Sequence, residues 1–382
     1  MELNKQPHNL LAIGIDERVF DEGSPMRSKV FEYSKDFDSS YIMCRSLKTR
    51  GDIEVVEKVT FYPIYCPPLL FPLAVWFYGR RIIRKNSGRW LISSDNPFEL
   101  GLVSWVLARF FGAKLHLHLH TDLLSPPFRQ GSFMDRLRYW CGRFVLARAD
   151  SLRVVSGRIK KSLLGAGLVN SGVKISVLPI ATDISGFGLA KRSPNIDKKL
   201  GGFSFKMIAV GRFVDKEKNF SMLLEIMPGF LETCPEAVLF LVGDGPDRKK
   251  YESTIGDHEL EKNVIIEPWR KDLASFYKSF DVFVLSSNYE GWGRVVIEAM
   301  AAGLPIIMTD VGLAGEVVKN GINGIVVPVG DKTSFLKACV SMYYDKARRE
   351  IFAKKGHETV RNMLAAFKEE EYALRYRKSL EI

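Results

Sequence analysis

The sequence predicts an α/β protein built from two doubly wound parallel-sheet domains. Short apolar runs rich in β-branched residues recur along the chain, and amphipathic segments of helical length separate them, as in repeated βαβ units. These runs form two independent series, and a turn-rich stretch without periodicity lies between them at residues 180–199. A length of 382 residues is sufficient for two cores of ordinary size.

The apolar runs give the predicted strands in chain order. In the first half we expect strands at residues 10–16, 90–94, 114–120, 152–156 and 174–178. In the second half we expect them at residues 205–211, 238–243, 264–266, 282–285, 305–309 and 324–328. We therefore place an N-terminal domain at residues 1–190 and a C-terminal domain at 191–360, and we expect a helix at about 360–382 to pack back on the first domain.

Positive charge is concentrated in the first half of the chain. The formal net charge is +11, and residues 1–190 hold 26 Lys and Arg against 17 Asp and Glu, which leaves 29 against 27 for the remainder. The first half should therefore attract an anionic partner. A nucleic acid is disfavoured as that partner because no recognised nucleic-acid module accompanies the charge.

The cysteines and the apolar segments indicate the compartment. The five cysteines lie far apart, without the short spacing of a zinc or redox motif, which favours thiols in a reducing environment. We see no signal peptide at the start and no apolar stretch of about twenty residues that would span a membrane. We expect a cytoplasmic protein, with a peripheral position on the inner face of the plasma membrane as an option.

A glycine-rich turn with two glutamates follows the strand predicted at 282–285. Glu290 lies in the loop and Glu298 in the helix that follows. Gly291 and Gly293 leave the backbone open to a ligand, and the helix start offers N–H groups to an anion. The two carboxylates would then accept hydrogen bonds from separate hydroxyls of one extended ligand. The alternative is an ordinary turn before an amphipathic helix with solvated glutamates.

A cluster of cations follows the strand predicted at 205–211. Arg212 leaves the strand end, and Lys216 and Lys218 come just before a helix expected from about residue 219 to 231. An arginine and a lysine at a helix N-terminus are suited to bind a diphosphate. Taken singly, each of these residues would be an ordinary surface charge.

The ordered motifs of residues 205–331 resemble the signature of glycosyltransferase family 4. This family comprises retaining enzymes of the GT-B fold with a glycosyltransferase group 1 C-terminal domain, and Glu290 and Glu298 match its two glutamates separated by seven residues. The resemblance implies two Rossmann-like domains that face each other across a cleft. The motifs that carry it are residues 210–219, 242–246, 287–305, 309–312, 315–318 and 320–328.

The resemblance implies that the donor is a nucleotide-diphosphate sugar. Arg212 and Lys218 would hold its diphosphate. Glu290 and the backbone of residues 291–294 would hold the sugar, and Glu298 would accept hydrogen bonds from the ribose. The other positions assigned to the donor are Gly211, Gly291, Trp292, Gly293 and Arg294, with Trp269 and Arg270 beside the nucleobase.

The first half matches less densely. The resemblance implies that His120 would face the reacting sugar. Alternation puts His116, His118 and His120 on one strand face, and only the last reaches the carboxyl end of the strand. His116 and His118 are expected to pack or to support it. The similarity is to a bacterial and archaeal polysaccharide-type branch of the family, and residues 94–101, 118–122 and 149–156 carry it.

The first half also departs from the family pattern after its first strand. Many members have a Gly-Gly loop there, whereas residues 21–27 contain only Gly23. We assign Gly23 and Asp122 to the acceptor side.

Charge development favours a mechanism without a metal or any other cofactor. The resemblance implies retention of configuration, and no covalent nucleophile is evident, so we expect same-face attack with the leaving phosphate accepting the acceptor's proton. Arg212 and Lys218 would neutralise that phosphate in place of a divalent ion. Asp36 and Asp38 form an Asp-x-Asp pair of the kind that binds manganese in other glycosyltransferases, but we expect a solvated helix end there.

An apolar aromatic segment at residues 67–85 ends in four cations, Arg80, Arg81, Arg84 and Lys85. Such a segment could lie on an anionic membrane surface and bring the first domain to a lipid-linked acceptor. The alternative is a core helix with a basic end.

These features predict transfer of a sugar to a glycan or lipid-linked acceptor in the synthesis of a cell-surface polysaccharide or glycoconjugate. Two alternatives remain. One is a sugar-nucleotide epimerase or hydrolase on the same fold, and the other is a non-catalytic sugar-nucleotide-binding protein.

Overall fold

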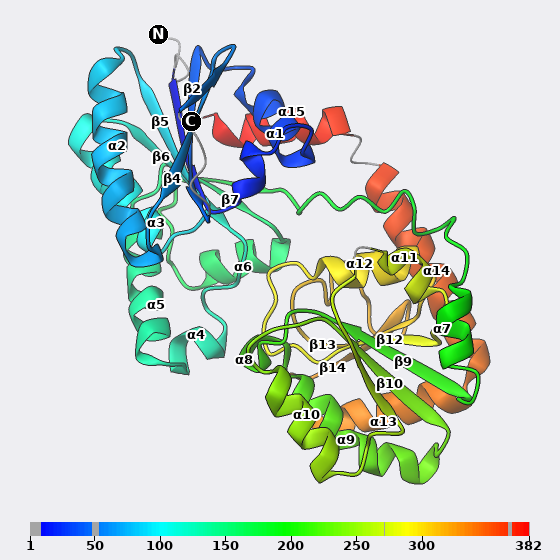
Figure 1. The fold of residues 1–382 in the computed structure, drawn as a ribbon. Coiled ribbons are helices and arrows are strands. Elements are labelled where there is room, and N and C mark those ends of the chain that lie inside the picture. Colours follow the sequence, from blue (N-terminus) through cyan, green and yellow to red (C-terminus); the bar gives the residue numbers. More distant parts are fainter. Residues whose placement is uncertain (1–8, 48–52, 271, 366–368, 382) are drawn as a thin grey trace. The chain divides into compact units, whose positions relative to one another are not determined.

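A computed structural model describes residues 9–47, 53–270, 272–365 and 369–381. The chain forms two compact units, residues 1–179 with 367–382, and residues 180–366 (Figure 1). The boundary expected at 190/191 lies inside the second unit. Two helices occupy the end of the chain where one was expected, and the last of them belongs to the first unit.

The first unit contains a sheet with the strand order β3-β4-β2-β1-β5-β6-β7-β8. Its strand pairs are parallel except for β3 with β4. The strands are β1 (Asn9–Gly14), β2 (Ser39–Ser46), β3 (Glu54–Val56), β4 (Val59–Tyr65), β5 (Trp90–Ser94), β6 (Lys114–Leu119), β7 (Ser151–Val154) and β8 (Lys174–Val177).

The second unit contains a wholly parallel sheet with the order β11-β10-β9-β12-β13-β14. Its strands are β9 (Phe205–Val210), β10 (Ala237–Val242), β11 (Val264–Glu267), β12 (Val282–Leu285), β13 (Ile306–Thr309) and β14 (Gly324–Val327). Every strand predicted from the sequence is present, with small shifts at the ends. The two parallel sheets with their helices confirm the predicted fold class.

The sequence pattern did not reveal β2, β3 and β4. In β2 serine, tyrosine and arginine alternate with the buried side chains, so no continuous apolar run marks the strand. In β4, Pro63 pairs in register with Cys44, although proline in a strand argues against a central position. The antiparallel β3 then covers the outer edge of β4.

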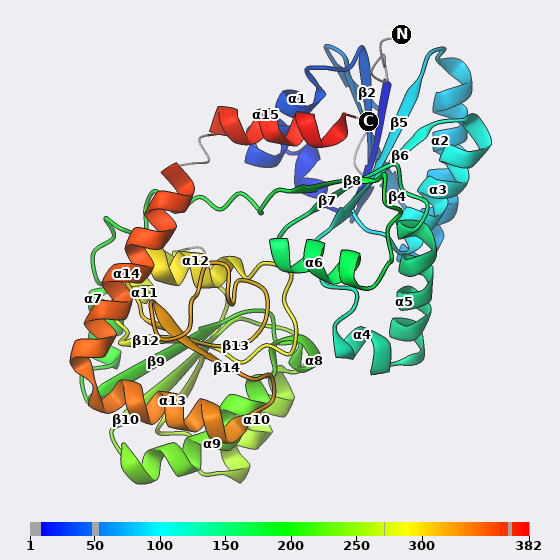
Figure 2. The ribbon, with the colours of Figure 1, turned by 180° about the vertical axis from the view of Figure 1, so that it is seen from behind.

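Helices lie on both faces of the first sheet. Figures 1 and 2 show α1 and α15 on one face and α2, α3 and α5 on the other. Several begin with proline or a capping side chain, as at Ser132, which forms a capping box with Asp135. They are α1 (Pro25–Ser34), α2 (Phe71–Lys85), α3 (Glu99–Phe111), α4 (Pro126–Gln130), α5 (Phe133–Leu146), α6 (Gly157–Gly165) and α15 (Glu369–Leu380), with short 3-10 turns η1 (Glu17–Phe20) and η2 (Pro68–Leu70).

The helices of the second unit enclose an aromatic core. Buried rings of Phe205, Phe213, Phe220, Phe230 and Phe335 pack between the sheet and its helices. The stretch expected as a linker contains the short helix α7. The helices are α7 (Pro194–Lys199), α8 (Asp215–Lys218), α9 (Phe220–Thr233), α10 (Arg248–Asp257), α11 (Leu273–Tyr277), α12 (Arg294–Ala301), α13 (Lys332–Tyr344) and α14 (Lys346–Ala365).

Candidate functional site

The second sheet has a topological switch point between β9 and β12. The chain builds outward from β9 through β10 and β11, and then returns to the other side of β9 to add β12. Loops that leave neighbouring strands at a switch point diverge, which opens a crevice at the carboxyl ends of the strands. The loops after β9 and β12, residues 211–219 and 286–293, are therefore the expected ligand site of this unit.

These two loops meet in an ion pair between Lys218 Nζ and Glu290 Oε1. Only 14% and 12% of the two side chains are exposed. Ser287 Oγ donates to the same glutamate oxygen at 3.1 Å. Because a buried charge without its partner carries a desolvation cost, an anion that draws Lys218 away would bind best if it also brought a donor for Glu290. A sugar phosphate offers both, since its phosphate is anionic and its hydroxyls donate.

Hydrogen bonds hold α8 against the loop after β12. Asn288 N donates to Glu217 O at 2.8 Å, and Asn288 Nδ2 donates to Lys216 O at 3.1 Å. Ser286 Oγ donates to Lys218 O at 2.8 Å. The ion pair therefore lies between two backbone segments that are fixed to each other.

Arg212 lies on the same loop as Lys218 but has its own carboxylate partner. Its Nη2 is 2.8 Å from Glu217 Oε2, and 70% of the arginine side chain is exposed. An exposed pair of this kind stabilises by about 1 kcal/mol or less, so a phosphate can replace the carboxylate. The neighbouring Gly211 is buried, and a Cβ added there would contact the aliphatic part of Lys218 at 3.4 Å.

Helix α12 begins beside Glu290. Gly293 precedes it with φ +87°, a conformation that favours glycine, and no side chain in the described part of the chain caps the helix start. Its first N–H groups therefore lack the side-chain acceptor that Ser132 gives α5. Arg294 at the first position is exposed.

Glu298 lies one turn along α12 and is 8% exposed. Burial raises the pKa of its carboxyl group, and Arg294, with Nη2 at 3.7 Å from Oε1, partly offsets the shift. A buried carboxylate needs hydrogen-bond donors, which ribose hydroxyls would supply. Its placement is compatible with the role that the resemblance implies.

The turn between Glu290 and α12 packs tightly against the end of β13. Gly291 is buried, and so is the Trp292 side chain, whose Nε1 has no hydrogen-bond partner among the described residues. Gly312 has φ +51°, and a Cβ added there would lie 2.9 Å from both Glu290 Cβ and Trp292 O. Gly312 was part of a motif in the sequence, but its role in shaping this loop depends on a contact that the sequence does not reveal.

Trp269 and Arg270 follow β11, two strands away from β9 in the sheet. Trp269 is 55% exposed, and Arg270 Nη1 is 3.2 Å from Glu267 Oε1. The arginine also lies over the ring of Phe276 at 4.7 Å. Both residues are at the carboxyl edge of the sheet, together with Arg212, Lys218, Glu290 and Glu298.

The first sheet has its own switch point, between β1 and β5. Two of the three histidines lie on β6, which is next to β5, and His120 follows its end. His116 and His118 are buried, which lowers the pKa of each imidazole well below its usual value. His120 keeps exposed surface just past the strand end. Desolvation by the surrounding protein lowers the pKa of His120, and the charge of Arg153 acts in the same direction.

Asp95 follows β5 directly, and it was not assigned a role from the sequence. Its Oδ1 is 3.4 Å from His118 Nδ1. Burial raises the pKa of this carboxyl group, which His120 and Arg153 partly offset. Its position at the end of an apolar strand, in the motif at residues 94–101, was the available signal.

A buried arginine links the histidines to the end of the chain. Arg153 on β7 is 6% exposed and makes no ion pair with a carboxylate in the part of the chain that the structure describes. Its Nη2 donates to Tyr372 Oη at 2.8 Å, and its guanidinium lies 5.3 Å from the ring centre of Tyr376. Tyr376 Oη is in turn 3.3 Å from His118 Nε2. Helix α15 thus completes the polar layer behind His120.

Gly23 and Asp122, the two residues assigned to the acceptor side, make no contact with the polar layer behind His120 among the contacts of the described residues. Gly23 is an exposed turn residue with φ +73°. Asp122 Oδ1 accepts from Leu124 N at 3.0 Å and from Ser162 Oγ at 3.2 Å, so it holds a turn and contacts α6. Neither contact set identifies a ligand.

The Asp-x-Asp pair follows the end of α1. Asp36 is 53% exposed, and its Oδ2 is 2.9 Å from Arg377 Nε on α15. This contact gives Asp36 a structural partner.

Across the described residues, no helix is both long and apolar enough to cross a membrane.

A comparison with protein families finds a match to the second unit. Residues 195–359 match the family described as "Glycosyl transferases group 1". A lipopolysaccharide core biosynthesis glycosyltransferase of Rhizobium meliloti is 32% identical over 154 residues, which is 40% of this chain and 44% of that protein. An Escherichia coli UDP-Gal:alpha-D-GlcNAc-diphosphoundecaprenol alpha-1,3-galactosyltransferase is 33% identical over 182 residues, 46% of each chain. The alignments thus span about half the length of these two relatives.

The similarity to solved structures extends over both units. A sucrose-phosphate synthase from Thermosynechococcus elongatus superposes with a TM-score of 0.73 over 97% of each chain, at 21% sequence identity. The chain therefore has the GT-B fold of glycosyltransferases, and its residues 195–359 match a group 1 glycosyl transferase domain.

Proposed function

We propose that this protein is a retaining glycosyltransferase of family 4 that moves a sugar from a nucleotide-diphosphate sugar to a glycan or lipid-linked acceptor. The observation that carries the proposal is the buried pair of Lys218 and Glu290 at the β9/β12 switch point. A ligand that is an anion and carries a hydroxyl donor would satisfy both Lys218 and Glu290, and a sugar diphosphate has both features.

The donor would lie along the carboxyl edge of the second sheet. Lys218 and Arg212 would exchange their carboxylate partners for the diphosphate, with the start of α12 nearby. Glu290 would then accept from sugar hydroxyls and Glu298 from the ribose. The exposed indole of Trp269 would border the base.

Bond cleavage develops negative charge on the leaving diphosphate and positive character on the anomeric carbon. The bond between that carbon and the phosphate oxygen breaks, and its electron pair stays on the phosphate. The acceptor hydroxyl attacks the same face and gives its proton to the departing phosphate oxygen. Cations fixed at the diphosphate stabilise this charge distribution most in the transition state. We propose that His120 faces the sugar during transfer, as a neutral imidazole.

We also propose that Lys218 and Arg212 make a divalent metal unnecessary, and that the protein works in the cytoplasm. Loss of transfer in EDTA with recovery on manganese addition would refute the first statement. The acceptor class is supported by the names of two relatives, one of which acts in lipopolysaccharide core biosynthesis and the other on a GlcNAc-diphosphoundecaprenol. The product would contribute to a cell-surface polysaccharide or glycoconjugate.

The test is a thermal-shift screen with UDP-, GDP- and ADP-sugars. One nucleotide should raise the melting temperature, and Arg212→Ala and Lys218→Ala should each reduce the rise, whereas Lys249→Ala on exposed α10 should not. If the rise in melting temperature is unchanged by both substitutions, the diphosphate binds elsewhere.

A second assay incubates the protein with the donor and no acceptor. Consumption of the donor under these conditions would indicate an epimerase or hydrolase instead.

A further inference from the structure

The helical layer of α2, α3 and α5 in the first unit has an unusual outer face. Helix α3 lies in the middle, where it packs on α2, on α5 and on the sheet. Each helix buries one side, as with Val75, Leu107 and Val145. The opposite sides of such helices are normally polar.

Here the outward sides are apolar. On α5, Phe133, Leu137, Trp140 and Phe144 follow the spacing i, i+4, i+7, i+11, which places them on one stripe opposite the buried one. Trp140 is 64% exposed. The other exposed apolar residues of the layer are Leu69, Leu70, Leu73 and Phe77 at α2, Leu102, Val106 and Phe110 on α3, and Met134 on α5.

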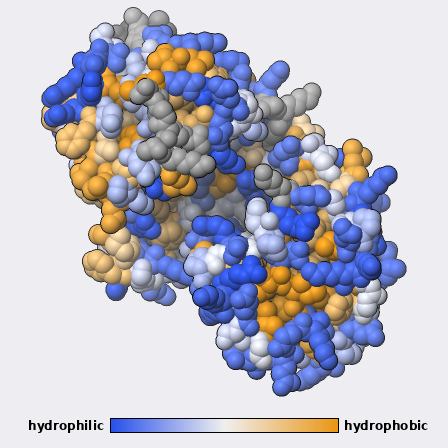
Figure 3. Space-filling view, viewed as in Figure 1, coloured by the Kyte–Doolittle hydropathy of each residue, from blue (hydrophilic) through white to orange (hydrophobic). Residues whose placement is uncertain are grey.

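Ring contacts join the three helices on this side. Trp76 of α2 lies edge-on to Phe110 of α3, with ring centres 5.8 Å apart. Trp105 of α3 lies edge-on to Phe144 of α5 at 4.9 Å. The apolar residues therefore form one surface, which we call the outer face, and Figure 3 shows hydrophobic side chains gathered on this side of the unit. Contiguous apolar surfaces of this kind mark interaction sites.

The charge on the same helices is strongly positive. They carry eight Lys and Arg residues against two acidic ones, Glu99 and Asp135. Glu99 is already paired with Arg138, and Asp135 caps α5. The basic end of α2 makes no ion pair within the described ranges; it consists of Arg80, Arg81, Arg84 and Lys85.

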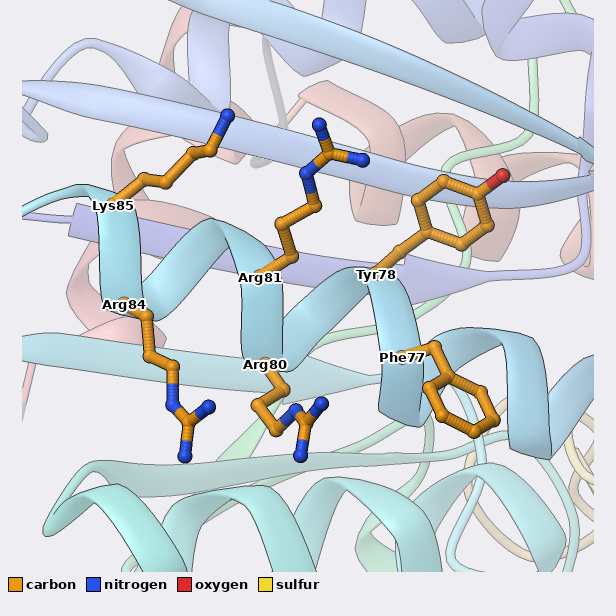
Figure 4. Close-up of a pocket in the computed structure, with 6 residues that line it drawn as sticks. All are labelled: Phe77, Tyr78, Arg80, Arg81, Arg84 and Lys85. Carbon is orange, nitrogen blue, oxygen red and sulfur yellow. The ribbon is translucent and has the colours of Figure 1, made fainter.

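These cations line an open pocket of about 530 Å³ together with two aromatic rings. Figure 4 shows Tyr78, Arg81 and Lys85 pointing to one side of α2, and Phe77, Arg80 and Arg84 to the other. A group bound on either side of α2 would meet two positive charges next to one aromatic ring. Phosphate headgroups above acyl chains have this chemistry.

We infer that the outer face docks on an anionic lipid bilayer, with the α5 stripe inserted at the interface and the basic end of α2 on the headgroups. Tryptophan, phenylalanine and arginine side chains suit the boundary between acyl chains and headgroups. A second copy of the chain fits less well, since two such faces would bring like charges together. The inference rests on the proposed function only in that the bilayer would hold a lipid-linked acceptor.

The test is co-sedimentation with vesicles of equal parts phosphatidylglycerol and phosphatidylcholine, and with vesicles of phosphatidylcholine alone. The protein should bind the anionic vesicles at least about tenfold better. Leu137→Gln with Trp140→Gln should lower binding about tenfold or more at both low and high salt, because it removes apolar contact. Arg81→Gln with Arg84→Gln should lower binding at low salt only, because salt screens charge.

Matched controls come from the second unit. Tyr344 and Ile351 are also exposed apolar residues, so Tyr344→Gln with Ile351→Gln should leave vesicle binding unchanged. Lys249→Gln with Lys262→Gln removes two exposed cations and should likewise have no effect. Equal loss in an outer-face variant and its control would overturn the inference.

Two further outcomes would overturn it as well. One is absence of binding to either vesicle type. The other is a discrete dimer, seen by sedimentation velocity without lipid, that Leu137→Gln with Trp140→Gln abolishes while vesicles bind neither form. Binding by Lys218→Ala protein should equal that of the unaltered chain, and the outer-face variants should keep the sugar-nucleotide thermal shift. Failure of the inference is thereby distinguished from failure of the proposed function.

Discussion

The carboxyl edges of the two sheets use opposite electrostatic designs. In the second unit, the loops at the switch point carry full charges in matched pairs, Lys218 with Glu290 and Arg212 with Glu217. In the first unit, the corresponding edge carries His120 and Asp95. Behind them lie two buried histidines with lowered pKa values and a buried arginine without a carboxylate partner among the described residues.

This difference shows how each edge can treat a ligand. Paired charges can exchange partners, so the second edge can admit an anion that carries hydroxyls. The imidazoles and tyrosines of the first unit offer neutral hydrogen-bonding groups beside Arg153 and Asp95, which suits the hydroxyls of a sugar or acceptor. The comparison leads to four predictions, ordered by expected size.

The largest effect should follow from Lys218→Ala. Removing a fixed cation from the leaving phosphate should lower turnover about 10²- to 10³-fold, with a smaller change in the KM for the donor. Steady-state kinetics of sugar transfer give both quantities, and Lys249→Ala serves as the control. A raised KM for the donor with unchanged turnover would mean that Lys218 binds the ground state and the transition state equally.

The free energy of unfolding should also depend on the pair of Lys218 and Glu290, because both side chains are largely buried. Lys218→Ala leaves Glu290 largely buried without its cation, at a cost of about 3 kcal/mol in the free energy of unfolding. Adding Glu290→Gln removes the charge and should restore most of that loss. Urea unfolding of the two single variants and the double variant measures the coupling. If the double variant loses as much as the two singles together, the pair is not coupled.

The sequence predicted the second edge far better than the first. In the second unit, the candidate residues lie in the loops and short helices that come after strands marked by apolar runs, as Arg212 and Lys218 come after β9. Parallel strands then bring these loops to one edge, so local pattern and topology suffice. The partners within that edge, such as Glu217 for Arg212, depend on side-chain geometry that no spacing encodes.

The first edge escaped prediction because its parts come from distant segments. Arg153 on β7 and Tyr372 on α15 are separated by 219 positions in the chain. Nothing in the sequence pattern indicates that an arginine in an apolar strand and a tyrosine in a charged helix contact each other. The strands β2 and β4 were missed for a local reason, since polar residues and Pro63 interrupt their apolar pattern.

Acid should destabilise the first unit before the second. The folded-state pKa values of His116 and His118 lie below the unfolded value of about 6.5, so the unfolded chain binds more protons as pH falls through that value. Their contribution to stability is fully present above about pH 6.5 and is lost below it, by up to about 1.4 kcal/mol per histidine for each pH unit. The raised pKa of Asp95 acts in the opposite direction.

Hydrogen exchange measured by mass spectrometry at pH 7.5 and 5.5 would localise this effect. After correction for intrinsic exchange, peptides from β5, β6 and β7 should lose protection, while peptides from β9 and β12 should keep it. His258→Gln, at the exposed end of α10, should not alter the pattern. Equal loss of protection in both units would show that the histidines do not govern the acid response.

The smallest effect should come from Tyr372→Phe, which removes one hydroxyl from the layer behind His120. That hydroxyl accepts from Arg153 and donates to Pro179 O, both at 2.8 Å. Its loss leaves a buried guanidinium with fewer partners and should cost about 1–2 kcal/mol, seen as a lower urea midpoint for the first unit. Tyr344→Phe, at an exposed tyrosine of α13, should have no effect. An unchanged midpoint in Tyr372→Phe would mean that water replaces the hydroxyl, and that packing rather than this hydrogen bond holds α15 on the sheet.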